Sequence, residues 1–222
     1  MLHFSPSILS ADFVRLGEEI ACAEKGGADY LHFDVMDGIF VKSISFGMPV
    51  LRCVRAVTDL FLDVHLMVTE PERYIDDFVR CGADLISVHV EAVRDVDAAI
   101  KAIRDGGVKV GLAISPETSV EHVRPYIGKI DQVVVMLVHP GFGEQSYLPE
   151  CAEKIPELKK MIEESGYDVD IEVDGGVKTD NVEHFIDLGA NVIVAGSAVF
   201  RGNALENAKK FTEILAKKES AK

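Results

Sequence analysis

Short apolar runs rich in β-branched residues recur along the chain, and each is followed by a turn signal and then a segment with helical spacing. Such runs are typical of buried parallel strands. We predict eight strands, at residues 4–9, 30–34, 61–68, 85–89, 108–114, 132–138, 170–174 and 192–195. Amphipathic helical segments lie between them, for example 13–25, 71–81, 96–105, 119–127, 149–165 and 179–188.

Three of the predicted helices end in the same short motif, a glycine and an alanine followed by Asp or Asn. The motifs are Gly27-Ala28-Asp29, Gly82-Ala83-Asp84 and Gly189-Ala190-Asn191. Glycine at this position adopts the left-handed conformation that ends a helix and starts a tight turn into the next strand. The repetition indicates that one strand and one helix form the building unit.

Strict alternation of strands and helices implies parallel pairing with right-handed crossovers. Eight such units in 222 residues fit a single (β/α)8 TIM barrel, with an open doubly wound α/β sheet as the alternative. Polar residues gather where the predicted strands end, and this favours the barrel, in which chemistry takes place at that rim. We expect residues 1–222 to form one barrel domain, with 217–222 as a solvated tail.

The overall charge and hydropathy exclude several kinds of partner. The formal net charge of −14 repels polyanions, so we expect neither nucleic acid nor an anionic membrane surface to bind. The sequence contains no apolar run near the roughly 20 residues that span a bilayer. The first residues also lack the basic and apolar regions of a signal peptide, so a cytoplasmic location is expected.

Two histidines and two aspartates stand out as candidate metal ligands. The two-residue period of a strand places His32 and Asp34 on one face of the second predicted strand, while His65 and Asp174 belong to the third and seventh. Such groups inside strands must be paired or bound, because an isolated buried charge is very unfavourable. A mixed nitrogen and oxygen set suits Zn, Fe(II), Mn or Co. A hydrogen-bonded core network without metal is the alternative.

Three glycine-bearing loops follow the sixth, seventh and eighth predicted strands. In barrels, the loops after strands seven and eight commonly bind phosphate through backbone amides and a short helix N-terminus. Any one of these loops by itself is also compatible with a plain turn. Together they predict a phosphate site whose candidate contacts are Gly141, Phe142, Gly143, Glu144, Gly175, Gly176, Gly196 and Ser197.

The order and spacing of six stretches resemble the ribulose-phosphate 3-epimerase family from end to end. These stretches are residues 5–12, 32–38, 63–68, 140–143, 172–176 and 196–198. The resemblance implies that the two histidines and two aspartates bind one divalent transition metal per chain, with zinc expected first. It also implies that Asp34 and Asp174 are the catalytic acid–base pair, that Ser7 and His65 contact substrate, and that the protein is a homo-oligomer.

The activity implied by this resemblance is the interconversion of D-ribulose 5-phosphate and D-xylulose 5-phosphate. One aspartate would remove the C3 proton, a metal would stabilise the enediolate, and the other aspartate would return a proton to the opposite face. Met36, Met67 and Met136 recur near strand ends; they either form an apolar collar around this chemistry or simply fill the barrel core.

Several positions depart from the family pattern. Glu144 stands where a second glycine is usual, and Lys42, Ser43, Leu137 and His139 also differ. Allulose 6-phosphate is therefore an alternative substrate, and an unphosphorylated ketose is a further one. Whether Lys42 offsets the charge of Glu144 is left open.

Two other classes of barrel remain as alternatives. A sugar-phosphate-binding barrel without catalysis would need the glycine loops but not the histidines and aspartates. A decarboxylase with a Lys-Asp array would need lysine at the C-terminal end of a strand, whereas Lys109 lies near the start of one.

Overall fold

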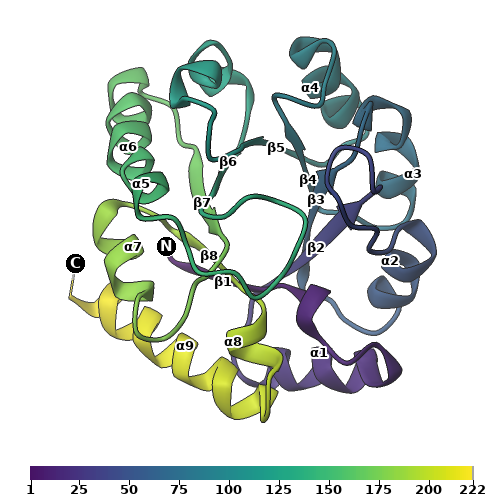
Figure 1. Cartoon of the computed structure of the whole chain (residues 1–222), viewed down its shortest axis with the longest axis vertical. Coiled ribbons are helices and arrows are strands. Elements are labelled where there is room, and N and C mark those ends of the chain that lie inside the picture. Colours follow the sequence, from purple (N-terminus) through teal and green to yellow (C-terminus); the bar gives the residue numbers. More distant parts are fainter. Residues whose placement is uncertain (222) are drawn as a thin grey trace.

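Eight parallel strands form a barrel in the computed structural model, which describes residues 1–221 (Figure 1). The strands are β1 (His3–Pro6), β2 (Tyr30–Met36), β3 (Phe61–Met67), β4 (Leu85–His89), β5 (Lys109–Ile114), β6 (Gln132–Met136), β7 (Asp170–Asp174) and β8 (Val192–Ala195). They pair in the order β1-β8-β7-β6-β5-β4-β3-β2, and a parallel bridge between Ser7 and His32 joins the two ends. The barrel prediction is confirmed, and the open sheet is excluded.

Helices surround the strands on the outside of the barrel (Figure 1). They are α1 (Leu16–Lys25), α2 (Met48–Arg55), α3 (Ile75–Arg80), α4 (Val96–Asp105), α5 (Pro149–Ala152), α6 (Lys154–Ser165), α7 (Val182–Leu188), α8 (Ser197–Phe200) and α9 (Ala204–Ser220). Short 3-10 helices supplement them: η1 (Ile8–Ser10), η2 (Phe13–Arg15), η3 (Pro71–Arg73), η4 (Val120–His122) and η5 (Arg124–Lys129).

Several predicted elements have other bounds than the observed ones or are divided into two, and two of these differences have a clear physical reason. The first strand ends at Pro6 rather than at residue 9, because the Ser7 hydroxyl accepts a hydrogen bond from the Leu9 amide and starts η1. The predicted helix at 119–127 is wrong, since this segment forms η4 and η5. Pro125 has no amide hydrogen to donate and disfavours helical backbone at the residue before it, which prevents a continuous α-helix.

The repeated Gly-Ala motifs have the predicted conformation. Gly27, Gly82 and Gly189 have φ values of 99°, 99° and 126°, in the region that favours glycine. The polar residue that ends each motif then accepts a hydrogen bond from a backbone amide of a neighbouring strand, as Asp84 Oδ2 does from Leu62 N at 2.7 Å. Each motif therefore turns the chain and also fixes the position of the neighbouring strand along the barrel axis.

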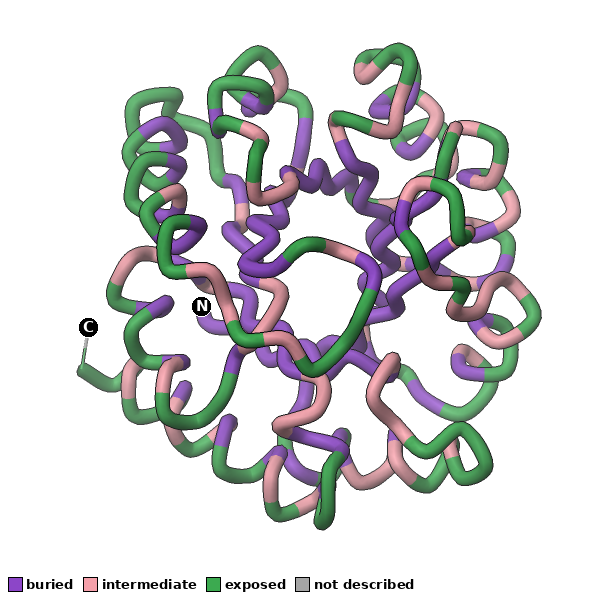
Figure 2. The backbone as a smooth tube through the Cα atoms, viewed as in Figure 1, coloured by how far each residue is buried: buried purple, intermediate pink, exposed green. Residues whose placement is uncertain are grey.

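Apolar side chains from the outer face of the barrel pack against the helices. Leu31, Phe33, Leu62 and Val64 are fully buried in this layer together with helix residues such as Phe78. Burying a side chain of this size stabilises the fold by about 1.5–3 kcal/mol. Figure 2 shows the strands as an almost continuous buried ring inside more exposed helices.

The end of the chain is helical as far as Ser220. The predicted tail at 217–222 thus begins inside α9, where Glu219 Oε1 accepts a hydrogen bond from the Leu2 amide at 2.6 Å. Lys222 lies outside the described residues. Within residues 1–221, no helix combines the length and the apolarity needed to cross a membrane.

Candidate active site

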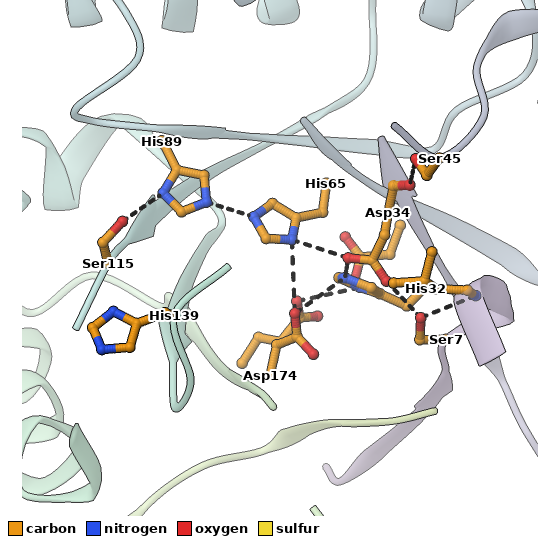
Figure 3. A network of polar contacts seen from close by, with 12 residues as sticks. Ser7, His32, Asp34, Ser45, His65, His89, Ser115, His139 and Asp174 are labelled. Atoms are coloured by element: carbon orange, nitrogen blue, oxygen red, sulfur yellow. Dashed lines mark hydrogen bonds and ion pairs between the residues drawn. The ribbon is translucent and has the colours of Figure 1, made fainter. Parts of the chain in front are cut away.

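Four side chains converge at the C-terminal rim of the barrel (Figure 3). His32 and Asp34 come from β2, His65 from β3 and Asp174 from the end of β7. Asp34 Oδ1 lies 3.2 Å from His32 Nε2 and 3.4 Å from His65 Nδ1. Asp174 Oδ2 lies 3.8 Å from both nitrogens. The four residues that sequence periodicity placed on inward faces therefore meet around one point.

The contacts of His32 fix which of its nitrogens carries the proton. Its Nδ1 lies 2.8 Å from Asp63 Oδ2, and an ionised carboxylate only accepts hydrogen bonds, so Nδ1 is the donor. In the neutral imidazole this leaves a lone pair on Nε2, which is buried and has no hydrogen-bond partner within residues 1–221. The free lone pair of His32 faces Asp34 and Asp174.

A longer chain of contacts fixes the proton of His65. Its Nε2 lies 2.9 Å from His89 Nε2, and His89 Nδ1 lies 3.1 Å from Glu91 Oε2. His89 therefore donates from Nδ1 to Glu91 and accepts at Nε2 from His65. His65 Nδ1, like His32 Nε2, is left as a buried lone pair with no hydrogen-bond partner among the described residues.

These four residues fit a divalent cation. Donor atoms about 2.0–2.2 Å from one tetrahedral ion lie about 3.4 Å apart, close to the separations seen here. The pocket also attracts positive charge: burial alone would lower the pKa of His32, but Asp34, Asp63 and Glu172 together raise it well above its usual value, so a bound cation would take the place of a proton on Nε2. Two unprotonated nitrogens and two carboxylates suit the transition metals better than Ca or Mg.

The environment separates the pKa values of the two aspartates. Burial opposes ionisation of Asp34, but His32 and His65 outweigh burial and hold its pKa well below the usual range. Asp34 Oδ2 also accepts a hydrogen bond from the Ser7 hydroxyl at 2.5 Å. Burial, and then the negative charge of Asp34, raise the pKa of Asp174 to about 7. A bound cation would favour the ionised form of both.

A layer of buried polar residues lies beneath these four. Gln132 Nε2 donates to Glu172 Oε2 at 3.1 Å and to Asp63 Oδ1 at 3.5 Å. Burial and the nearby Asp63 carboxylate raise the pKa of Glu172 well above its usual value. Asp63 and Glu172 lie two positions before His65 and Asp174, so strand periodicity places them on the same inward faces. The structure shows that they surround the Nδ1 side of His32.

A cavity of about 210 Å³ opens at this rim. Ser7, Asp34 and Asp174 line its floor, and Met36, Met67 and Met136 line it from β2, β3 and β6. His32 and His65 are fully buried and are not among the lining residues. The predicted phosphate contacts also line this cavity: Gly141, Phe142, Gly143, Glu144, Gly175, Gly176, Gly196 and Ser197. The cavity therefore brings the two aspartates and the glycine loops into one space.

The glycines allow the loops to approach one another closely. Gly176 has a φ of 69°, and a Cβ atom at this position would lie 2.5 Å from the Tyr147 backbone nitrogen. Gly175 has a φ of 115°, and a Cβ atom there would lie 2.5 Å from Val138. The loop after β7 thus packs directly against the loop after β6.

Sequence reasoning missed two cationic residues that line the cavity, Lys178 and Arg201. Arg201 forms an ion pair with Glu144, so the partner of Glu144 is Arg201 rather than Lys42. A possible signal was the position of both cations, each within a few residues of a predicted glycine loop.

Most of the departures from the family pattern lie away from the cavity. Leu137 is fully buried in the layer between strands and helices, and the exposed His139 has its Nδ1 3.1 Å from Glu117 Oε1. Of the five positions, Glu144 alone lines the cavity. The other four departures, at Lys42, Ser43, Leu137 and His139, therefore do not change the lining of the cavity around the two aspartates.

A buried cluster of candidate metal ligands at the C-terminal ends of barrel strands, beside glycine loops, is typical of a (β/α)8 barrel enzyme, whose active site lies at this rim. Comparison with known sequences narrows this class. Residues 3–200 match the profile of the ribulose-phosphate 3-epimerase family, and the chain belongs to this family of isomerases.

The relatives agree with this assignment over most of the chain. A ribulose-phosphate 3-epimerase of Bacillus subtilis is 49% identical over 201 residues, which cover 90% of this chain and 93% of the relative. One from Synechocystis sp. is 46% identical over 214 residues, covering 96% and 90%.

Solved structures add support for the fold. The crystal structure of KGPDC from Streptococcus mutans superposes with a TM-score of 0.72 and covers 98% of this chain and 99% of its own. At 15% sequence identity, the similarity concerns the barrel fold alone.

Proposed function

We propose that this enzyme interconverts D-ribulose 5-phosphate and D-xylulose 5-phosphate by inverting the configuration at C3. Membership of the ribulose-phosphate 3-epimerase family supports the reaction. The observation that supports the mechanism is geometric: Asp34 and Asp174 line the same cavity and approach the same two imidazole nitrogens. Two carboxylates from different strands can reach two faces of one bound carbon atom.

His32, Asp34, His65 and Asp174 would hold one divalent metal ion. When bound, the ion acts as a Lewis acid that stabilises the negative charge developing on the ketose oxygens after C3 loses its proton. Zinc is the ion we expect, and Fe(II), Mn and Co suit the same donors. Elemental analysis of the purified protein tests this proposal, with about one transition metal per chain as the expected result.

Asp34 and Asp174 would act as the acid–base pair. One carboxylate removes the C3 proton on one face, and the carboxylic acid of the other supplies a proton to the opposite face. The reaction runs in both directions, because the two groups exchange roles when the substrate is the other epimer. Ser7 would keep Asp34 in position through its hydrogen bond and contact the substrate.

The glycine loops would bind the phosphate of the substrate. The cavity is lined at the loops after β7 and β8 by Gly175, Gly176, Gly196 and Ser197. Their backbone amides would donate to the phosphate oxygens. Met36, Met67 and Met136, at most 5% exposed, would form the apolar wall that keeps water from the reacting carbons.

The deciding experiment compares kcat/KM for ribulose 5-phosphate, allulose 6-phosphate and the corresponding free ketoses in one coupled assay. We expect ribulose 5-phosphate to be preferred. A preference for allulose 6-phosphate would keep the chemistry but change the substrate. A preference for a free ketose would contradict the proposed phosphate site.

We also propose that residues 1–222 fold as one domain, and that the protein works as a homo-oligomer in the cytoplasm. Light scattering coupled to size-exclusion chromatography gives the particle mass. A monomer mass at working concentration would contradict the oligomer.

A further inference from the structure

A carboxylate lies where the proposed function requires the cavity to accept a phosphate. Residues 137–148 connect β6 to α5 and cross the mouth of the barrel (Figure 1). Within this segment Glu144 has a φ of 67°, in the region that favours glycine. Its side chain lines the same cavity as Gly176 and Gly196. An unshielded carboxylate here would repel a phosphate dianion.

Arg201 lies directly after α8 and shields this charge. Its Nη2 atom pairs with Glu144 Oε2 across the cavity edge, between the loops after β6 and β8. The contact uses one nitrogen of a guanidinium that has five N–H donors in a planar fork, so Nε and Nη1 can donate elsewhere. Planar guanidinium groups recognise phosphate well, because two parallel donors match two oxygens.

The ion pair has little importance for holding the fold together. The Arg201 and Glu144 side chains are 68% and 50% exposed, and pairs this exposed contribute little to the free energy of unfolding. Its effect is on the charge of the cavity. With Arg201 present, the pair is neutral, and Lys178 adds a further cation to the cavity lining. Without Arg201, Glu144 has lost the cation that pairs with it.

We propose that Arg201 is a phosphate-binding residue that this chain requires because Glu144 places a carboxylate in the cavity. Arg201 holds the Glu144 carboxylate with Nη2 and directs its remaining donors to the phosphate monoester of the substrate. This inference rests on the proposed function for the position of the phosphate. It makes Arg201 and Glu144 a coupled pair that sets specificity for phosphorylated ketoses.

The first test is Arg201→Gln, assayed for the KM of ribulose 5-phosphate and for the inhibition constant of inorganic phosphate. Loss of a charge-assisted contact predicts a rise of about tenfold in both constants, with a smaller change in kcat. Arg124→Gln is the matched control, because Arg124 forms a similarly exposed pair with Glu121 and does not line the cavity. This control should leave both constants as in the wild type.

The second test adds Glu144→Gln to Arg201→Gln. Because the repulsion disappears with the carboxylate while the Arg201 contact stays lost, the double variant should recover only part of the lost phosphate affinity, whereas Glu144→Gln alone should change it little. The proposal is overturned if Arg201→Gln keeps both constants within about twofold of wild type, or if the double variant binds phosphate as weakly as Arg201→Gln. Circular dichroism confirms that each variant is folded.

The two levels of proposal can fail separately. If wild-type protein does not turn over ribulose 5-phosphate, the proposed function fails. Calorimetric titration with inorganic phosphate would still measure the contribution of Arg201 in that case. A loss of phosphate affinity in Arg201→Gln would then support the binding role, and an unchanged affinity would overturn it.

Discussion

The Nε2 atoms of His65 and His89 lie 2.9 Å apart, and both imidazole rings are fully buried. One nitrogen must donate and the other accept, and Glu91 decides which, because its carboxylate accepts from His89 Nδ1. Through His89, Glu91 thereby determines that His65 carries its lone pair on Nδ1. The two histidines of the site differ in their support: Asp63 contacts His32 directly, whereas His65 is supported through a second imidazole.

Disrupting this chain of contacts should weaken metal binding. We expect His89→Gln and Glu91→Gln to lower metal affinity by about 10- to 100-fold, since partners behind a ligating histidine fix its orientation and tautomer. Competition with a chelator of known affinity measures the change. The exposed His122→Gln is the control, and unchanged affinity in both test variants would contradict the role given to Glu91.

Removing either carboxylate of the acid–base pair should stop exchange at C3. Proton transfer by a positioned side chain contributes about 10²- to 10⁴-fold, so Asp34→Asn and Asp174→Asn should lose at least that much turnover. Incorporation of deuterium from solvent at C3 is the measurement. The exposed Asp168→Asn should behave as wild type, and full activity in either test variant would exclude the two-base scheme.

Acid should destabilise the protein partly through Glu91. Burial opposes its ionisation, but His89, Thr118 and the Ser115 amide outweigh burial and lower its pKa from 4.5 to about 2. A depressed pKa stabilises the fold above the unfolded-state value of about 4.5, and this stability is lost as pH falls toward 2. The full effect is about 3 kcal/mol.

Denaturant unfolding of wild type and Glu91→Gln at pH 7 and pH 3 measures this contribution. The wild type should be the more stable protein at pH 7, and the difference in free energy of unfolding should shrink at pH 3. A difference that does not depend on pH would show that the Glu91 charge contributes nothing.

Alanine substitution at two glycines can separate the effect of loop packing from the effect of an unfavourable φ, because the two glycines have similar φ values but different surroundings. Gly176 and Gly166 have φ values of 69° and 74°; a Cβ atom at Gly176 would meet Tyr147, whereas one at Gly166 would meet open space. Both alanine variants should lose about 1 kcal/mol of stability from the positive φ, and Gly176→Ala should lose more because of the contact with Tyr147. Gly176→Ala alone should raise KM, by about tenfold, because the loops after β6 and β7 must separate. Equal KM values in the two variants would contradict this.

Strand periodicity predicted much of the site, because it determines which side chains face the barrel axis. His32, Asp34, His65 and Asp174 were all found in this way. Loop conformation follows no such period, so the pairing of Glu144 with Arg201, 57 positions apart, could not be read from the sequence. His89 ends a predicted strand at the reactive rim, and this was a usable signal for its role that sequence reasoning did not take up.

Helices were less predictable than strands. Apolar spacing in residues 119–127 suggested an α-helix, but Pro125 allows only two short 3-10 helices. Spacing describes which face is buried, whereas the hydrogen-bonding capacity of individual residues decides the type of helix.

The polar filling of the barrel has a consequence for how such a protein can change. The interior of the barrel contains the polar side chains of Asp63, Gln132 and Glu172. The apolar core that stabilises the fold lies on the other side of the sheet, between the strands and the helices. The outer face of the eight strands therefore stabilises the fold, and the inner face carries the reactive groups. New chemistry can be introduced on the inner surface while the outer one goes on maintaining the architecture.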